Sequence, residues 1–275
     1  MLTFRGKTAV ITGGAAGIGR ALAERCLAEG MNVVIADVEG PVLESTLEAL
    51  HDHQDHLRGI RVDVSQANEV EALAKFTRSV FGDVHLLFNN AGVGAGSTAW
   101  ESTLHDWTWV MGVNLWGVIH GIRSFVPDML AHGEPGYVVN TASIAGLVRG
   151  HHSAAYATTK HAVVALSEQL QVEFERTGAK LRCAALCPSW VNTRINEGGR
   201  NRPEHLRNPQ ANRPPTAESL QKWAQIQAAA AQATPPAEIA DFVFAGMRAG
   251  KHYLLPHAES KGWVERRFEG ILRDC

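Results

Sequence analysis

The chain lacks three features that would each assign it to a particular class of protein. It has no basic excess, since 26 Lys and Arg face 28 Asp and Glu for a net charge of −2, and nucleic-acid recognition needs a strongly positive surface. No apolar run approaches the roughly 18 residues that cross a bilayer. The four cysteines show no metal-type pairing and are typical of cytosolic thiols. We therefore expect no nucleic-acid partner, no membrane span and no metal.

The amino-terminal segment carries two charges but no apolar core of a signal peptide, so we expect a soluble, cytoplasmic protein. Of its 275 residues, 45% are hydrophobic and 20% charged, which is enough apolar surface for a sizeable core.

Short apolar runs alternate with segments of helical period along most of the chain. The predicted strands are 7–11, 32–36, 59–62, 84–88, 137–142, 181–186 and 253–255. The predicted helices are 18–29, 41–50, 66–80, 104–131, 153–176 and 236–248. Continuous apolar strands separated by helices indicate a doubly wound parallel α/β sheet of about seven strands with helices on both faces. The unbroken alternation favours a single domain over 1–275.

One segment, 194–233, interrupts this alternation with Arg, Asn, Pro and Gly and then a helix-like stretch. So long an insertion is usually functional, and we interpret it as a substrate loop or lid within the domain. Between 194 and 213 it contains five arginines, at 194, 200, 202, 207 and 213, and two glutamates. They form either a solvated surface or a site for an anionic substrate, an acyl carrier or lid-closing salt bridges.

The first predicted strand ends in a glycine-rich turn, and a helix follows directly. Glycines allow close backbone approach to a pyrophosphate, and the helix N-terminus presents free N–H groups to its charge. The turn predicts a Rossmann-type dinucleotide site at Gly13, Ala16, Gly17, Ile18 and Gly19.

Asp37 closes the second strand eighteen residues after Gly19, where a carboxylate can accept the two hydroxyls of an adenosine ribose. A 2′-phosphate would meet like charge there, so the sequence favours NAD(H) over NADP(H). The alternative is that Asp37 caps the helix before Pro41.

Two further strand ends carry residues that fall on the same rim of the sheet. They are Asp63 with Val64, and Asn90 with Ala91 and Gly92. Turn formation explains both nearly as well as ligand binding does.

Ser143, Tyr156 and Lys160 form the most specific constellation. Tyrosine and lysine at i and i+4 share one helical face, and an ammonium beside a phenol favours the phenolate. Tyr156 would thereby become a general base nearer to working pH. Ser143, at the end of the fifth strand, can hydrogen-bond the substrate oxygen. With only three tyrosines in the chain, a core role for Tyr156 is the alternative.

In order and spacing these motifs resemble the short-chain dehydrogenase/reductase (SDR) family, over residues 5 to about 193 and again at 236–256. The resemblance implies hydride transfer between nicotinamide and a substrate carbon, without a metal. Tyr156 would be the acid/base, Ser143 would orient the substrate oxygen, Lys160 would bind the nicotinamide ribose, and Asn114 would hold a relay water.

The resemblance also assigns the cofactor contacts. Asp63 and Val64 would flank the adenine, Asn90 would approach the adenosine ribose, and Val191 and Thr193 would contact the carboxamide. The predicted cofactor set is Gly13, Ala16, Gly17, Ile18, Gly19, Asp37, Asp63, Val64, Asn90, Ala91, Gly92, Tyr156, Lys160, Pro188, Val191 and Thr193.

The chain departs from the family pattern after the sixth strand, where Pro188-Ser189-Trp190 replaces the usual Pro-Gly. Serine adds a Cβ where backbone passes close to the nicotinamide. Trp190 then helps to wall a predicted substrate pocket with Ser143, Val148 and Tyr156.

Two aromatic groups have open interpretations. Trp100, Trp107, Trp109 and Trp116 favour core packing or a subunit interface over substrate contact. His151 and His152 are either a solvated pair or part of the pocket.

The leading hypothesis is an NAD(P)-dependent oxidoreductase of small-molecule secondary alcohols and ketones. The stretch 196–204 is similar to bacterial members that oxidise bulky aromatic alcohols, including lignin-type aryl ethers. One alternative is an NADPH-dependent 3-oxoacyl reductase, which Asp37 disfavours. Another is a catalytically silent dinucleotide-binding regulator, which would not need Tyr156 and Lys160. The resemblance also suggests a homotetramer or homodimer, with helices 104–131 and 153–176 as interface candidates.

Overall fold

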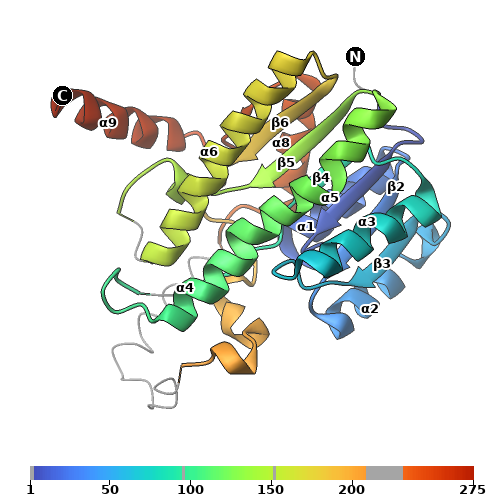
Figure 1. Ribbon diagram of the computed structural model, residues 1–275, viewed down its shortest axis with the longest axis horizontal. Coiled ribbons are helices and arrows are strands. Elements are labelled where there is room, and N and C mark those ends of the chain that lie inside the picture. Colours follow the sequence, from blue (N-terminus) through green and yellow to red (C-terminus); the bar gives the residue numbers. More distant parts are fainter. Residues whose placement is uncertain (1–2, 95–96, 151–152, 209–231) are drawn as a thin grey trace.

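A computed structural model describes residues 3–94, 97–150, 153–208 and 232–275 (Figure 1). Seven strands form one sheet in the order β3-β2-β1-β4-β5-β6-β7, and every neighbouring pair is parallel. The strands are β1 (Thr8–Thr12), β2 (Asn32–Asp37), β3 (Leu57–Arg61), β4 (Leu86–Asn89), β5 (Gly136–Thr141), β6 (Leu181–Leu186) and β7 (Tyr253–Leu254). The predicted doubly wound parallel sheet in a single domain is confirmed, with strand bounds shifted by a few residues.

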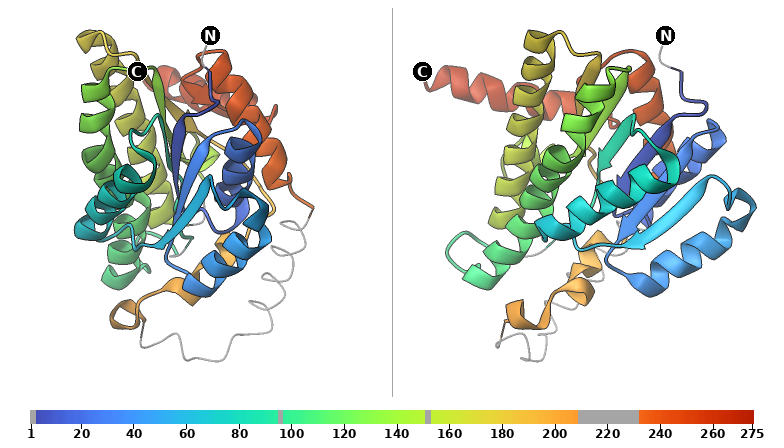
Figure 2. Two further views of the ribbon diagram at one scale, coloured as in Figure 1. Left: turned by 90° about the vertical axis from the view of Figure 1, so that its right-hand side faces the viewer. Right: turned by 45° about the vertical axis from the view of Figure 1, so that its right-hand side comes forward.

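Helices cover both faces of the sheet (Figure 2). One face packs against α1 (Gly17–Ala28), α2 (Gly40–Ala49) and α8 (Pro236–Arg248). The other packs against α3 (Ala67–Phe81), α5 (Gly117–His132) and α6 (Ala154–Thr177). Ile11 and Val10 of β1 belong to opposite cores because successive strand side chains point to opposite faces. Burial on both faces explains why the strands are continuously apolar.

The structure differs from the predicted helices at two places. The predicted helix 104–131 is divided into α4 (Leu104–Met111), one π-helical turn at Gly112–Trp116, and α5. A further helix, α9 (Ser260–Arg273), follows β7 and extends away from the body of the domain (Figure 1). Its few apolar residues are separated by charged residues and two glycines, so the sequence shows no clear helical periodicity there.

The described part of the insertion contains two short 3-10 helices, Ile195–Asn201 and Glu204–Leu206. Its helix-like stretch lies within 209–231, outside the described residues. Within the described ranges, no helix has the length and apolar character that crossing a membrane requires.

Candidate active site

The glycine-rich turn is built for close backbone approach. Gly13 and Gly17 have φ of 63° and 53°, a region that favours glycine. A Cβ on Gly19 would lie 2.0 Å from the Gly13 carbonyl oxygen, so a side chain there would break the turn. The N-cap of α1 is Ala16, which makes no side-chain cap. The first N–H groups of α1 are therefore available to an anion.

Asp37 connects this turn to the residue that caps helix α2. Its Oδ2 accepts from Ala15 N–H at 3.1 Å, and its Oδ1 accepts from Glu39 N–H at 3.1 Å. Burial raises the pKa of Asp37, and these backbone hydrogen bonds oppose the rise. The N-cap of α2 is Glu39, so the helix-capping alternative for Asp37 is wrong.

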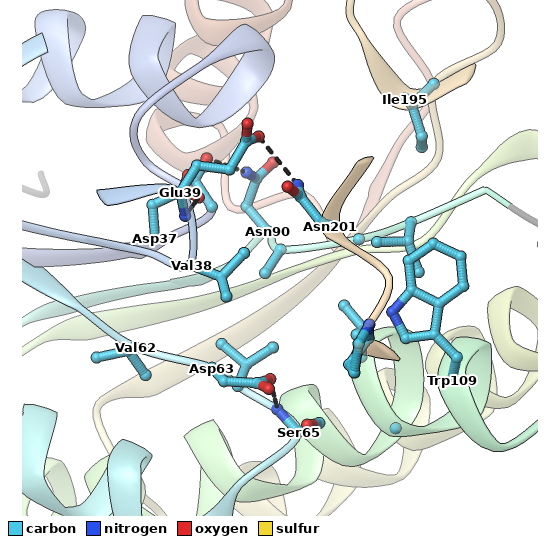
Figure 3. A pocket seen from close by; sticks show the side chains of 18 of the residues that line it. Asp37, Val38, Glu39, Val62, Asp63, Ser65, Asn90, Trp109, Ile195 and Asn201 are labelled. Carbon is cyan, nitrogen blue, oxygen red and sulfur yellow. Dashed lines mark hydrogen bonds between the residues drawn. The ribbon is translucent and has the colours of Figure 1, made fainter. Parts of the chain in front are cut away.

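A cavity of about 600 Å³ opens beside the turn at the carboxyl ends of the strands (Figure 3). Most of the predicted cofactor residues line it: Gly13, Ala16, Gly17, Ile18, Asp37, Asp63, Val64, Asn90, Ala91, Gly92 and Thr193. Gly19, Tyr156, Lys160, Pro188 and Val191 are not among its lining residues. The glycine cradle, the free helix terminus and the carboxylate on one cavity fit the pyrophosphate and ribose of a dinucleotide.

The Asn90 side chain stabilises the glycine-rich turn through hydrogen bonds to its backbone. Its Nδ2 donates to the carbonyls of Thr12 and Gly13 at 3.1 and 3.3 Å, and its Oδ1 accepts from Thr141 Oγ1 at 3.3 Å. These bonds engage the amide within the protein, although Asn90 still borders the cavity. Its direct contribution is therefore to the shape of the turn.

Lys160 is buried next to Tyr156. Its Nζ lies 5.5 Å from the centre of the Tyr156 ring and donates to the Thr141 carbonyl at 2.8 Å. Burial lowers the pKa of Lys160 to about 8. Burial also raises the pKa of Tyr156, and a hydrogen bond with Ser143 only partly opposes this.

The expectation that Lys160 lowers the pKa of Tyr156 is therefore wrong for the ligand-free protein. Desolvation disfavours the charged form of both groups, and the ammonium is held by Thr141 rather than by the phenol oxygen. Tyr156 is consequently a protonated phenol at neutral pH.

Ser143 follows β5 and faces the loop after β6. Its Oγ accepts from Ala145 N–H at 3.1 Å and lies 3.4 Å from the Pro188 carbonyl oxygen. The Pro188 carbonyl also accepts from Ile144 N–H at 2.9 Å. The serine is thus positioned by two backbone segments while it contacts Tyr156.

Asn114 lies in the π-helical turn and is fully buried. Its Oδ1 accepts from Val93 N–H at 2.8 Å, and its Nδ2 donates to the Val93 carbonyl at 3.0 Å and to Thr159 Oγ1 at 3.3 Å. A Cβ on Gly92 would lie 3.5 Å from Asn114 Oδ1 and 3.6 Å from Lys160 Nζ. Asn114 and Lys160 therefore meet beside the cofactor cavity.

The remaining predicted pocket residues are more dispersed. Trp190 is about half exposed, and Val148 is partly buried. Val191 is buried and pairs with Thr234 in an isolated bridge, so its side chain belongs to the core. His151 and His152 lie outside the described residues.

Residues 194–208, hereafter the strap, extend along the cofactor cavity, whereas the sequence predicted a substrate loop or lid without assigning it to the cofactor side. Ile195, Arg200, Asn201, Pro203, His205 and Leu206 line the cavity. Arg200 pairs with Glu39 at 2.7 Å, and Asn201 donates to the same carboxylate at 2.9 Å (Figure 3). The strap therefore lies beside the carboxylates at the end of β2.

The other end of the strap is held by α4. Arg202 pairs with Asp106 at 2.6 Å and packs over the Trp109 ring, 5.2 Å from its centre. Two of the five arginines thus pair with residues outside the insertion. Arg194 and Arg207 pair within it, and Arg213 lies outside the described residues. Trp109 is buried in a core cluster, as predicted, and it also lines the cavity together with Trp116.

The fold and this site define a nicotinamide-dinucleotide oxidoreductase, and comparisons with known proteins agree. A family model described as short chain dehydrogenase matches residues 7–204. The chain is 42% identical to a short chain dehydrogenase/reductase from Burkholderia phymatum solved in complex with NAD, with a TM-score of 0.94, covering 100% of this chain and 97% of that one.

Two curated relatives are named as dehydrogenases. The chain is 36% identical over 196 residues to 3beta-hydroxysteroid dehydrogenase 2 of Eggerthella lenta, covering 71% of this chain and 75% of the relative. It is 28% identical over 273 residues to C alpha-dehydrogenase of Sphingobium sp., covering 99% and 87%.

The chain belongs to the short-chain dehydrogenase family. It is an NAD(P)-dependent oxidoreductase that acts on the CH–OH group of alcohols and the corresponding ketones.

Proposed function

We propose that this enzyme uses NAD in preference to NADP to oxidise bulky, aromatic secondary alcohols. The carboxylate of Asp37 at the cavity rim is the observation that carries the cofactor preference. Its two oxygens are held by Ala15 and Glu39 N–H groups, which fixes it toward a ribose diol. A 2′-phosphate would be repelled by this carboxylate. The Burkholderia relative bound to NAD supports the same assignment.

We assign the chemistry to Tyr156, Ser143, Lys160 and Asn114. Bound nicotinamide supplies the hydride acceptor or donor. Tyr156 removes the hydroxyl proton in oxidation and returns it to the carbonyl oxygen in reduction, while Ser143 hydrogen-bonds that oxygen. Burial raises the pKa of Tyr156, which favours the protonated phenol that reduction needs. Oxidation needs the tyrosine proton to leave, and the Lys160 ammonium, 5.5 Å from the centre of the Tyr156 ring, is an adjacent charge that would favour the phenolate once the cofactor is bound.

We propose a second role for the buried pair of Asn114 and Lys160. Lys160 holds its ammonium on the Thr141 carbonyl, next to the Gly92 end of the cavity. From there it can bind the ribose hydroxyls on the nicotinamide side. Asn114 fixes the Val93 backbone beside it, and the second lone pair of its Oδ1, near Gly92, would accept from a relay water.

The substrate class rests on three observations. The stretch 196–204 resembles members acting on bulky aromatic alcohols, and the whole chain matches C alpha-dehydrogenase. A shorter match is to a hydroxysteroid dehydrogenase. The segment 194–233 would form the substrate loop, with its described part, the strap, closing the cofactor side. Trp190 and Val148 would wall the substrate side.

We also propose a cytoplasmic homodimer or homotetramer. The two long helices α5 and α6 present exposed apolar side chains at Leu130 and Val172, which are 43% and 54% exposed. Burial of these residues against a second copy would remove them from water.

Parallel assays test the proposal. The purified protein would be mixed with NAD or NADP and secondary alcohols ranging from 2-butanol to 1-arylethanols with bulky aryl ethers, and the absorbance of reduced cofactor followed. We expect turnover with NAD at least tenfold above NADP in kcat/KM, confined to aryl alcohols. Preferred reduction of 3-oxoacyl thioesters with NADPH would instead support the 3-oxoacyl reductase alternative. Tight NADH binding without turnover of any substrate would support the silent regulator.

A further inference from the structure

His257, which follows β7, connects three parts of the chain near the catalytic residues. Its Nδ1 lies 3.1 Å from the backbone nitrogen of Ser189. Its Nε2 lies 3.0 Å from Thr234 Oγ1 and 3.2 Å from the Trp190 carbonyl oxygen. The imidazole therefore connects the loop after β6 with the point where the chain returns from the insertion.

These contacts favour one tautomer of the imidazole. A backbone N–H can only donate, so Nδ1 must accept the Ser189 hydrogen bond with its lone pair. The single ring proton is then on Nε2, where it can donate to the Trp190 carbonyl or to Thr234 Oγ1. A neutral His257 thus uses both ring nitrogens.

The peptide group that His257 holds is the one that contacts Ser143. A peptide bond is planar and, when trans, directs its C=O and N–H to opposite sides. In the peptide between Pro188 and Ser189, the carbonyl accepts from Ile144 N–H at 2.9 Å and lies 3.4 Å from Ser143 Oγ. The N–H of the same peptide donates to His257. Rotation of this plane would therefore move the oxygen that faces Ser143.

The same loop continues to the cofactor turn. The Thr193 methyl carbon would lie 3.0 Å from a Cβ placed on Gly17, so the loop passes directly over the glycine-rich turn. Backbone pairing of Asn192 N–H with the Thr234 carbonyl at 3.0 Å adds to the anchor that His257 makes with Thr234. The loop from 188 to 193 thus extends from Ser143 to the cofactor turn, and His257 anchors it between these two ends.

We propose that His257 is a positioning residue for catalysis, which fixes the Pro188–Ser189 peptide and, through it, Ser143 and the nicotinamide end of the cofactor site. This proposal rests on the function proposed above. Ser189 occupies the position at which the family pattern has glycine, so the imidazole anchors a loop that departs from this pattern. His257 itself does not touch the reacting atoms.

Substitutions at His257 can separate its two nitrogens. The Asn Oδ1 in His257→Asn can replace Nδ1 as the acceptor for Ser189 N–H, whereas the amide of His257→Gln reaches the Nε2 partners instead. His257→Ala removes both contacts. A matched control is His132→Ala, because His132 is also partly buried and also contacts one backbone carbonyl, that of Val84, at 2.9 Å. Val84 precedes β4 and so lies at the amino ends of the strands, opposite the end that carries the cofactor cavity.

The first readout needs no turnover. Hydrogen exchange of the ligand-free protein, followed by mass spectrometry on peptides covering 188–193, reports the Ser189 amide. We expect exchange at least tenfold faster in His257→Ala and His257→Gln than in wild type, and near wild-type exchange in His257→Asn and His132→Ala. Unchanged exchange in His257→Ala would overturn the proposal.

The second readout separates positioning from folding and from cofactor affinity. With the best aryl alcohol of the panel, we expect kcat of His257→Ala to fall about tenfold to a hundredfold, as small misplacements do. NADH affinity should stay within threefold, and His257→Asn should recover kcat to within about threefold of wild type. If His257→Ala does not fold, comparing kcat of His257→Asn with kcat of His257→Gln tests the proposal instead. An Asn variant no faster than the Gln variant would contradict the proposal. Full turnover by Tyr156→Phe would instead refute the catalytic assignment and leave the exchange result standing.

Discussion

The two halves of the active-site cleft differ in the groups that form them. The half under β1 and β2 is largely backbone: a glycine turn, a free helix terminus, and the Asp37 carboxylate held by two N–H groups. The half under β5 and β6 consists of buried side chains, in which Lys160 and Tyr156 both have pKa values shifted toward their neutral forms. Backbone geometry suits recognition of an invariant ligand, whereas buried titratable groups suit proton transfer. Substitutions should therefore affect binding in one half and chemistry in the other.

The largest effect is expected in the catalytic half, from Tyr156→Phe. Removing the hydroxyl eliminates the acid/base group, and kcat should fall at least a thousandfold, within the range that general acid–base catalysis supplies. Stopped-flow measurement of reduced-cofactor formation checks this. Tyr137→Phe is the control, because Tyr137 is also buried but donates to the Lys251 carbonyl away from the cleft. Turnover of Tyr156→Phe within threefold of wild type would refute the mechanism.

Lys160→Met should separate activity from stability. Burial lowers the pKa of Lys160 from 10.5 to about 8, which corresponds to about 3 kcal/mol. The unfolded chain binds the extra proton between pH 8 and 10.5, so the unfolding free energy of the ligand-free wild type should rise with pH across that window. Below pH 8 the folded protein bears the whole cost of burying the charged ammonium of Lys160.

We therefore expect Lys160→Met to lose about a hundredfold in kcat and yet to unfold at a temperature a few degrees higher at pH 7. The lost hydrogen bond from the ammonium to the Thr141 carbonyl offsets about 2 kcal/mol of the gain, because its donor is charged. Thermal unfolding at several pH values measures both trends. A variant less stable than wild type at pH 7 would show that the buried ammonium stabilises the fold.

In the binding half, Asp37→Ser should weaken NAD affinity about tenfold to a hundredfold and leave kcat at saturating NAD within threefold. The loss follows from removing charged hydrogen bonds to the ribose, each about 1.5–3 kcal/mol. The preference for NAD over NADP in kcat/KM should fall by the same factor or reverse. An unchanged ratio would show that Asp37 does not select the cofactor.

The smallest effect is expected at the strap. Glu39→Gln removes the charge that pairs with Arg200, both side chains being partly exposed, and such a pair contributes about 1 kcal/mol or less. We expect the KM for NAD to rise twofold to fivefold, less so in high salt. The control is Asp128→Asn, which breaks the pair with Arg78 between α3 and α5. Equal changes in the KM for NAD in both variants would show that the strap does not contribute to cofactor binding.

Sequence patterns predicted the features that depend on local order. Apolar runs such as 32–36 gave the strands, and the glycine spacing gave the turn, because both constraints act within one or two elements. The π-helical turn at 112–116 escaped detection because one extra residue barely disturbs helical periodicity. The Arg200–Glu39 and Arg202–Asp106 pairs escaped because their partners are 161 and 96 residues apart. The spacing of Tyr156 and Lys160 placed them on one face but could not reveal their burial, which reversed the expected pKa shift.

Fluorescence titration with NADH tests the division between the two halves most directly. The dissociation constant would be measured for wild type, Asp37→Ser and Tyr156→Phe under the same conditions. We predict at least tenfold weaker binding for Asp37→Ser and binding within threefold of wild type for Tyr156→Phe. Equal weakening by both substitutions would contradict a cleft in which backbone and Asp37 bind the dinucleotide while Tyr156 serves the chemistry.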